Sequence, residues 1–454
     1  MSLRASSSSI LRSGIAAGAT RGAAATLPLR SGAVALPRHA TLPRARAPAA
    51  PRSFSTTTRR AEEYESPFGI NSLSKLTEEE EMLRDAVRRF AEDVVAPRVE
   101  AMDEAEKMDP AVIKGLFEQG LMGIETDPEF GGAGGSFTSA IIVIEELAKV
   151  DASVSVLCDV HNTLVDTVMR KYASKELQEK YLPQLSESKL GSFCLSEPAS
   201  GSDAFAMKTS CKKSDDGKHW IINGSKMWIT NSAEADFFIV FAQGDPSKGY
   251  KGISAFAVER EHGIEIAKKE KKLGIKASST CTVNFDEIKI PIGNLIGEEG
   301  KGYKIAIEIL NEGRVGIGAQ MIGLAQGAYD KAVRYAFERK QFGKPVASFQ
   351  GMQFQMAQAL TDIEAARMLV YNAARLKEEG RPFTKQAAMA KLFSSQVAQR
   401  VAGQAIEWAG GQGFTREMGL SKYWCDSKIG AIYEGTSNIQ LQTIFKLSQA
   451  EMGL

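Results

Sequence analysis

The sequence contains few of the residues that build metal centres and disulfide frameworks. Its 454 residues include only five cysteines and four histidines. The cysteines form no C-x-x-C pair, and the histidines form no H-E-x-x-H motif. Neither a zinc ribbon nor a disulfide scaffold is therefore indicated, and we predict no metal site. We interpret His161 and His219 as structural or exposed residues.

The glycine-rich signatures of common nucleotide-binding folds are also missing. The chain contains neither G-x-G-x-x-G nor G-x-x-x-x-G-K-[ST], so neither a Rossmann dinucleotide site nor a P-loop is predicted. Long apolar runs are absent as well, because charges interrupt stretches such as "AIIVIEELA" well before 18 residues. No membrane span is therefore expected.

Acidic residues are absent from the first sixty positions. This stretch holds ten arginines and is rich in serine, alanine and proline, and the first acid is Glu62. Such a composition is typical of a mitochondrial targeting segment, so we assign residues 1–60 to one, with a cut after Phe54. A disordered cytosolic tail remains the alternative. The rest of the chain has 46 basic and 55 acidic residues, a net charge of about −9, which argues against nucleic acid as a partner.

Three segments with different periodicity follow a linker that ends near Pro67. In residues 68–190, Thr77 and Glu80 have the spacing of a capping box, and apolar residues recur at helical intervals after them. We predict an N-terminal helical domain here, with helices near 77–96, 110–122, 136–150, 153–173 and 175–186.

The middle segment, residues 191–300, has short runs of β-branched and aromatic residues at intervals of about ten residues. We predict a small β-barrel domain. In "WIINGSKMWIT" the pair Asn223-Gly224 predicts a hairpin turn. Residues 301–454 return to a helical period, with long helices expected at 302–340, 349–378, 384–411 and 437–451. The short loops between them predict an antiparallel bundle, so the fold class is α+β.

Two stretches contain residues suited to a site. "FCLSEPASGSDAFAMKT", residues 193–209, is a loop of small residues that would let backbone N–H groups approach a flat or anionic ligand, although an ordinary connecting loop fits equally well. "IGAIYEGTSNIQLQ", residues 429–442, places the single acid Glu434 between Tyr433 and Gly435. By itself this pattern also describes a surface acid at a loop-to-helix joint.

Taken together, these stretches and three others resemble the acyl-CoA dehydrogenase family. The others are "KMWIT", "ERKQFGKPVASFQ" and "EWAGGQGF". The motifs occur in the family's order, and the similarity covers nearly all of residues 70–454. Within the family, "KLGIKASSTC" and "LNEGRVGI" are similar to the short/branched-chain branch.

The resemblance implies an FAD-dependent enzyme that removes a proton from the α carbon of an acyl-CoA thioester while a hydride leaves the β carbon, giving a trans-2-enoyl-CoA. Glu434 is then the base. Burial among apolar neighbours would strengthen it, and donors aimed at the thioester oxygen would stabilise the enolate that develops. In the family these donors are an FAD hydroxyl and the base's own backbone N–H.

One position tests the assignment of the base within the sequence. Some relatives, such as isovaleryl-CoA dehydrogenase, carry the base directly before the arginine that corresponds to Arg314, and that position here is Gly313. Glu312 lies one residue earlier, about 100° around a helix, and is expected to point elsewhere.

The resemblance also implies binding residues for both ligands. The residues expected to hold FAD, partly across a subunit interface, are Phe193, Cys194, Leu195, Ser196, Ser202, Trp228, Ile229, Thr230, Arg339, Phe342, Gln350, Glu407, Trp408, Ala409, Gly410, Gly411, Thr436, Ser437 and Asn438. The residues expected to contact the substrate are Ser202, Tyr250, Tyr303, Asn311, Glu312, Gly313, Arg314 and Gly435. The alternatives are ordinary: Arg339 as a solvated charge, and Gly410-Gly411 as a helix C-cap.

These features lead to the expectation of a homotetrameric enzyme of the mitochondrial matrix. It would act on short straight or 2-methyl-branched acyl-CoA in fatty-acid and isoleucine/valine breakdown and pass electrons to electron-transfer flavoprotein. Two alternatives stay open. One is an acyl-CoA oxidase, distinguished by the reaction of its reduced flavin with oxygen. The other is a catalytically silent assembly or scaffold protein, distinguished by the absence of flavin colour.

Overall fold

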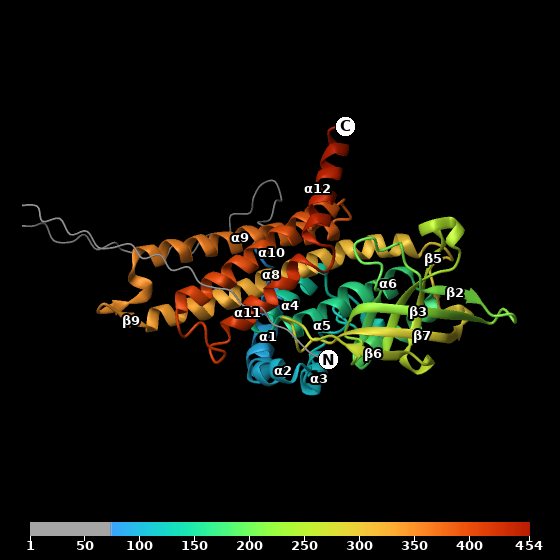
Figure 1. Cartoon of the computed structure of the whole chain (residues 1–454), viewed down its shortest axis with the longest axis horizontal. Coiled ribbons are helices and arrows are strands. Elements are labelled where there is room, and N and C mark those ends of the chain that lie inside the picture. Colours follow the sequence, from blue (N-terminus) through green and yellow to red (C-terminus); the bar gives the residue numbers. More distant parts are fainter. Residues whose placement is uncertain (1–72, 74) are drawn as a thin grey trace, which may run out of the picture. The chain divides into compact units, whose positions relative to one another are not determined.

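The computed structural model describes Leu73 and residues 75–454. The predicted targeting segment, 1–60, and its cut after Phe54 lie outside the described residues. Within the described part, helices come first, strands follow, and long helices complete the chain (Figure 1). This mixture of helices and sheet confirms the α+β class. The elements fall within the three predicted segments, whose boundaries stay predictions.

The first helix begins as its sequence predicts. The Thr77 hydroxyl accepts from the Glu80 backbone N–H at 3.2 Å, and the Glu80 carboxylate accepts from the Thr77 N–H at 3.0 Å, which completes the capping box. The helices of this segment are α1 Glu78–Phe90, α2 Val99–Ala105, α3 Pro110–Glu118, α4 Phe137–Val150, α5 Ala152–Asp159, α6 Thr167–Tyr172 and α7 Lys175–Glu187. Between α5 and α6 lies the π-helical segment η4, Val160–Asp166.

The strands of the middle segment form a mixed eight-stranded sheet within the described residues. Its order is β6-β7-β3-β2-β4-β5-β8, and β1 pairs in parallel with β4. The strands are β1 Gly191–Cys194, β2 Ser210–Lys213, β3 His219–Thr230, β4 Phe237–Gln243, β5 Ile253–Glu259, β6 Glu265–Lys269, β7 Thr280–Pro291 and β8 Leu295–Ile296. Strands β4 and β5 are buried along their whole length and pair with each other in antiparallel orientation.

The hairpin predicted at Asn223-Gly224 is wrong, because β3 runs through this pair without turning. The sheet holds the segment from both sides: β2 and β7 both pair with it, and the register with β7 shifts between Ile222 and Gly224. The Asn223 side chain spans the shift by accepting from the Glu287 backbone N–H at 2.8 Å and donating to the Glu287 carboxylate at 2.8 Å. Asparagine and glycine therefore form a bulge in this sheet.

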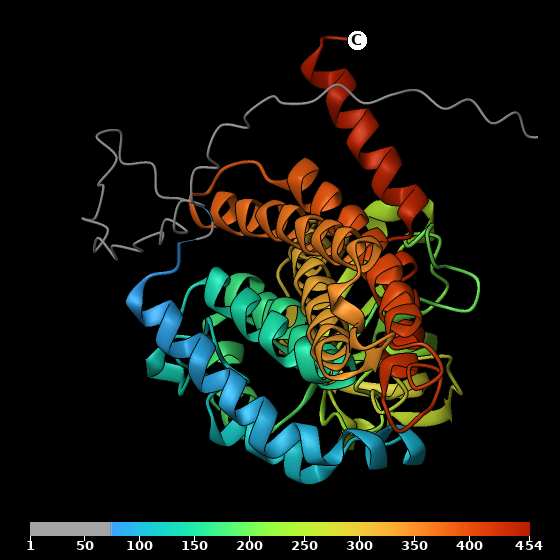
Figure 2. The same ribbon diagram turned by 90° about the vertical axis from the view of Figure 1, so that its left-hand side faces the viewer.

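The C-terminal segment is a layer of long helices. They are α8 Gly302–Glu338, α9 Gln350–Glu378, α10 Thr384–Ala409 and α12 Ser437–Glu451, together with the short α11 Leu420–Ser427, which the periodicity does not reveal. A small hairpin of β9 Lys340–Gln341 and β10 Lys344–Pro345 joins α8 to α9. Helix α12 projects away from the other helices in both views (Figures 1 and 2).

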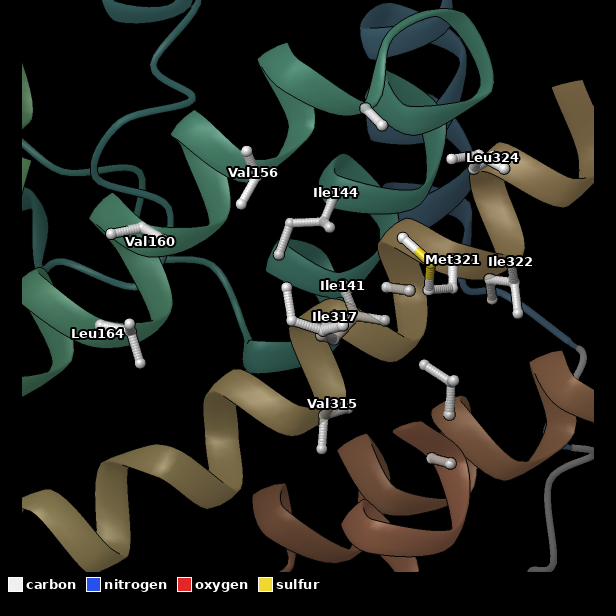
Figure 3. Packing of buried hydrophobic residues seen from close by; sticks show 14 of the residues in the cluster. Ile141, Ile144, Val156, Val160, Leu164, Val315, Ile317, Met321, Ile322 and Leu324 are labelled. Carbon is white, nitrogen blue, oxygen red and sulfur yellow. The ribbon is translucent and has the colours of Figure 1, made fainter. Parts of the chain in front are cut away.

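The main hydrophobic core lies where α8 crosses the helices of the first segment. Ile141 and Ile144 of α4 pack near Ile317 and Met321 of α8, and Leu164 of η4 belongs to the same cluster (Figure 3). This contact fixes α8 against η4, and both elements contribute to the site described below. No helix in the described part of the chain is long and apolar enough to cross a membrane.

Candidate functional site

Glu434 occupies a strained turn directly before α12. The turn follows a short 3-10 segment, Lys428–Ala431, and both Glu434 and Gly435 have positive φ, 50° and 85°. A left-handed conformation at a residue other than glycine costs on the order of 1 kcal/mol and persists only where its surroundings hold it. The buried amide of Gln440 donates to the Glu434 carbonyl at 2.9 Å and to the Gly435 carbonyl at 2.8 Å. The Lys391 ammonium donates to the Gly435 carbonyl at 2.6 Å.

The Glu434 carboxylate is turned into the protein. The residue keeps some exposed surface, but its Oε2 atom is buried and has no hydrogen-bond partner among the described residues. A Cβ atom placed on Gly313 would lie 2.8 Å from this oxygen and 3.0 Å from Leu164 Cδ2. A buried polar atom without a partner is uncommon and points to a role beyond folding. The glycine at position 313 provides the space that the carboxylate fills.

Burial determines the protonation of this carboxylate. It raises the pKa of Glu434 to about 7, and the positive charges of Lys391 and Arg314 oppose part of that rise. Burial lowers the pKa of Lys391 to about 8, and the negative charge of Glu434 resists this fall. The pKa of Arg314 is also lowered by burial. The result is a weakly acidic carboxyl group, which is suited to accepting a proton near neutral pH.

A second buried acid, Asp159, was missed by the sequence reasoning. Its carboxylate accepts from the Thr163 hydroxyl at 2.9 Å, and a Cβ on Gly316 would approach it within 2.1 Å. Burial raises its pKa well above the usual value, and the charge of Glu434 adds to that rise. A buried aspartate in an otherwise apolar run, "SVSVLCDV", is the only sequence signal that could have indicated it.

Glu312 points away from Glu434, as expected. Its carboxylate is 99% buried and pairs with Lys171 and, at 3.3 Å, with Lys377. These ion pairs connect α8 to α6 and α9. The predicted contact of Glu312 with the substrate would therefore have to compete with two lysines. In contrast, Asn311 contacts another of the predicted substrate residues. The side-chain oxygen of Asn311 accepts a hydrogen bond from the Arg314 guanidinium at 2.8 Å. The Arg314 Nε atom is buried without a partner in the part of the chain that the structure describes.

The predicted flavin-facing segments lie side by side. The Met227 N–H donates to the Ser196 carbonyl at 2.9 Å, and the Ser192 hydroxyl donates to the Thr230 carbonyl at 2.8 Å. The register shift between Lys226 and Ile229 leaves Trp228 with a φ of 67° and an indole ring that is 54% exposed. Such a bulge redirects a side chain out of the sheet.

The loop from Leu195 to Thr209 is clamped by a buried ion pair. Lys226 Nζ donates to Glu197 at 2.8 Å and to the Leu195 carbonyl at 3.0 Å. Glu197 also accepts the backbone N–H groups of Lys208 and Thr209 at 2.6 and 3.0 Å. The side chains of Phe193, Cys194, Leu195 and Ile229 are buried, whereas Ser202 is exposed. An exposed aromatic plane beside a fixed loop fits a flat ring system such as isoalloxazine.

Segment η4 connects this wall to the base. It packs against both β1 and α8. The Gly191 N–H of β1 donates to His161 Nδ1 at 3.0 Å, and His161 Nε2 lies 3.0 Å from the Leu185 carbonyl. Burial lowers the pKa of His161 to about 4, so the imidazole is a neutral structural link, as predicted. π-Helical turns often occur at functional sites, and this one contributes Leu164 to the surroundings of Glu434.

Two of the predicted substrate residues meet at the other side of the sheet layer. Tyr250 and Tyr303 form an edge-to-face pair with ring centroids 4.9 Å apart. Tyr303 is on the first turn of α8, and Tyr250 lies in the 3-10 segment before β5. Lys251 lies beside this pair, 6.0 Å from the Tyr250 ring centre. The structure thus brings together two aromatic rings that are 53 positions apart in sequence and a cation next to one of them.

The remaining predicted FAD residues gather elsewhere. Arg339, Phe342 and Gln350 are exposed around the β9 hairpin, which lies at the end of the helical layer opposite to the sheet (Figure 1). Trp408 is buried and donates from Nε1 to Gln355 at 3.0 Å, which brings the end of α10 near the start of α9. With it come Glu407, Ala409, Gly410 and Gly411. Within a single chain, this group of residues therefore lies apart from Trp228. The separation is consistent with a site shared between subunits.

The three residues after Gly435 begin α12. The Thr436 hydroxyl caps the helix by accepting from the Ile439 N–H at 3.4 Å, and the Ser437 hydroxyl donates to the Ala431 carbonyl at 3.5 Å. Asn438 is exposed. No cluster of three or more His, Cys, Asp or Glu side chains suited to a metal ion occurs within residues 73 and 75–454.

Comparisons with known proteins assign this architecture. Residues 77–189, 192–288 and 300–448 match the N-terminal, middle and C-terminal domains of acyl-CoA dehydrogenase. The chain is 52% identical over 380 residues to the mitochondrial short/branched chain specific acyl-CoA dehydrogenase of Rattus norvegicus, covering 84% of this chain and 88% of the relative.

Solved structures give the same result. Butyryl-CoA dehydrogenase from Megasphaera elsdenii is 40% identical with a TM-score of 0.81, covering 84% of this chain and all of that one. An acyl-CoA dehydrogenase complexed with FAD from Bacillus anthracis is 30% identical with a TM-score of 0.79, covering 85% and 69% of the two chains. The chain therefore belongs to the acyl-CoA dehydrogenase family.

Proposed function

We propose that this FAD-dependent acyl-CoA dehydrogenase oxidises short straight-chain or 2-methyl-branched acyl-CoA to trans-2-enoyl-CoA, with Glu434 as the base that takes the α-proton. The observation that carries the proposal is the buried, unpartnered Oε2 of Glu434, held against Gly313. Without a proton donor of its own, this oxygen can accept the proton of a ligand placed beside it. The pKa of Glu434, about 7, is closer to the pKa of a thioester α-proton than the pKa of an exposed glutamate is.

The backbone at the same residue supplies a second function. The Glu434 N–H donates to no acceptor in the described residues, so it can donate to the thioester oxygen as negative charge develops there. A donor in that role contributes on the order of 3 kcal/mol. Base and donor then belong to one residue, and its fixed positive φ sets their relative geometry.

The chain offers a matching surface for FAD. Residues Phe193–Ser196, Ser202 and Trp228–Thr230 would hold the isoalloxazine, while Arg339, Phe342, Gln350, Glu407–Gly411 and Thr436–Asn438 would hold the pyrophosphate and adenosine, partly from a second subunit. An arginine fork suits a diphosphate. When bound, FAD supplies the acceptor for the β-hydride.

The substrate residues divide between the two ends of the thioester. Asn311, Gly313, Arg314 and Gly435 would surround the reacting carbons, with Glu312 behind them. Tyr250, Tyr303 and Ser202 would contact the CoA portion. Because the pair of tyrosines is partly exposed and lies beside Lys251, it suits a ligand with an apolar stem and anionic groups.

The setting of the reaction is part of the same proposal. Relatives named as mitochondrial and the arginine-rich first sixty residues support a mitochondrial matrix enzyme of fatty-acid and isoleucine/valine breakdown. The separation of the two FAD residue groups within one chain supports a homotetramer. Electron-transfer flavoprotein would take the electrons from the reduced flavin.

The substrate range is tested by anaerobic bleaching of the purified holoenzyme. Butyryl-, 2-methylbutyryl-, isobutyryl-, isovaleryl- and octanoyl-CoA are mixed separately with the enzyme, and the loss of flavin absorbance is followed. We expect butyryl- or 2-methylbutyryl-CoA to bleach fastest. One methylene in an apolar pocket is worth about 1–3 kcal/mol, so octanoyl-CoA should be slower by tenfold or more. Fastest bleaching by octanoyl- or isovaleryl-CoA would exclude the proposed range.

The ionisation of Glu434 predicts a pH dependence. The base works only when ionised, so the rate of flavin reduction should fall as the pH decreases through about 7. The measurement is the second-order rate constant for flavin reduction by butyryl-CoA, taken well below saturation between pH 5.5 and 9, because this constant reports the pKa of the free enzyme. A free glutamate would keep the rate constant down to about pH 5, and that result would contradict the assignment.

A further inference from the structure

We propose that Lys391 and Gln440 are positioning residues that hold the Glu434 turn in its productive conformation, and that the positive charge of Lys391 favours the ionised Glu434 carboxylate before it takes the proton. The proposal rests on the proposed role of Glu434 as base. Lys391 lies outside the motifs by which the family was identified, Gln440 lies within residues 429–442 but was given no role there, and each acts through backbone or charge.

The geometry places two donors on the turn. The Gly435 carbonyl accepts from Lys391 Nζ at 2.6 Å and from Gln440 Nε2 at 2.8 Å, and the Glu434 carbonyl accepts from the same amide. A Cβ on Gly435 would lie 2.7 Å from Gln440 Nε2, so the amide packs directly on the turn. The two donors come from different helices, α10 and α12. Both carbonyls next to the base are thereby fixed to elements whose relative position depends on the bundle.

Lys391 is a buried cation that donates to the Gly435 carbonyl but has no carboxylate partner among the described residues. The residue has no exposed surface, and its ammonium lies within 4.0 Å of no carboxylate in the described part of the chain. An unpaired buried cation destabilises a fold, and an apolar side chain of similar length would pack without that cost. A Cβ on Gly318 of α8 would lie 3.8 Å from the backbone nitrogen of Lys391, so α8 and α10 are in ordinary van der Waals contact at this point. A lysine in this place is explained by what its charge does for Glu434.

The charges around Glu434 define the effect. Arg314 faces it from α8, Lys391 from α10 and Asp159 from α5. Tyr433, its neighbour in the chain, donates its hydroxyl hydrogen bond to Gln320. The charges that lower the pKa of Glu434 are those of Lys391 and Arg314. Of the two, only Lys391 also holds the turn, and removing it therefore changes both position and charge.

Three holoenzyme variants separate the two effects. Lys391→Met removes donor and charge, Gln440→Leu removes the other donor but leaves the charge, and Lys391→Gln keeps a polar side chain without charge. For each, the flavin content and the limiting rate of flavin reduction by butyryl-CoA are measured between pH 5.5 and 9.5. We expect the acid limb of the Lys391 variants to move upward by about one pH unit. Gln440→Leu should lose about ten- to hundredfold in rate with its acid limb unmoved.

A failure of the roles proposed for Lys391 and Gln440 can be distinguished from a failure of the proposed function. If Glu434→Gln is inactive but both Lys391 variants keep the wild-type acid limb, the charge role is overturned. If Gln440→Leu and Lys391→Met both keep the wild-type rate, the positioning role is overturned. If Lys391→Met does not bind FAD, the acid limb of Lys391→Gln decides. An active Glu434→Gln enzyme would overturn the proposed role of Glu434 as the base, whatever the Lys391 and Gln440 variants show.

Discussion

Replacement of Glu434 with glutamine is expected to lower the rate of flavin reduction by butyryl-CoA by about 10³- to 10⁴-fold, the range associated with loss of a general base. The amide has nearly the same shape, so the space against Gly313 stays filled. The loop clamped by Lys226 and Glu197 is untouched, and FAD content should equal that of the wild type. Stopped-flow absorbance under anaerobic conditions and the flavin-to-protein ratio measure the two quantities.

Glu451→Gln is the matched control for this substitution. Glu451 ends α12, the helix that follows the Glu434 turn, and it is exposed in an ion pair with Lys385. Its variant should reduce flavin at the wild-type rate. A Glu434→Gln enzyme that reduces flavin within tenfold of the wild type would exclude Glu434 as the base.

Moving the base to Gly313 is expected to restore part of the lost activity. In the Glu434→Gly background, Gly313→Glu places a carboxylate from α8 in the space that Glu434 Oε2 leaves, because the new Cβ begins 2.8 Å from the position of that atom. Leu164 Cδ2 lies 3.0 Å away and must shift, so recovery should be incomplete. We expect the double variant to reduce flavin about 10²-fold faster than Glu434→Gly alone.

The control for this swap is Gly313→Gln in the same Glu434→Gly background. It introduces a side chain of equal size without a base and should give no recovery. Equal rates in the glutamate and glutamine variants would show that filling the space, and not proton abstraction, restores the rate. Neither result depends on which acyl chain is preferred.

Much of the helical structure was predictable because it depends on local patterns. The Thr77–Glu80 capping box and the apolar spacing after it specify α1 without reference to the rest of the chain. Asn223-Gly224 shows where local reasoning fails. The pair has the chemistry of a tight turn, but pairing with β2 and β7 on both sides makes it a bulge within one strand. Strand pairing over about 70 residues outweighs the turn preference.

The residues of the site also differ in whether local sequence predicts them. Glu434, Gly313 and Arg314 stand in recognisable motifs, and the structure brings them together. Lys391 and Asp159 stand in ordinary helical sequence, and Gln440 lies at a helical position of the Glu434 motif, where a glutamine usually faces water. Their burial arises from the crossing of α8 with α10 and η4, which no single segment encodes. Periodicity therefore finds the helices but not the polar residues that meet between them.

The raised pKa of the unpartnered Glu434 carboxylate affects native stability and reactivity in opposite directions as the pH changes. Because the pKa of Glu434 in the folded protein exceeds that of a free glutamate, the native state holds this proton more tightly than the unfolded chain does. The stabilisation is complete below the unfolded pKa and is lost as the pH rises through about 7. The ionisation of Glu434 at higher pH thus makes the residue active as a base and, at the same time, removes its contribution to the stability of the fold.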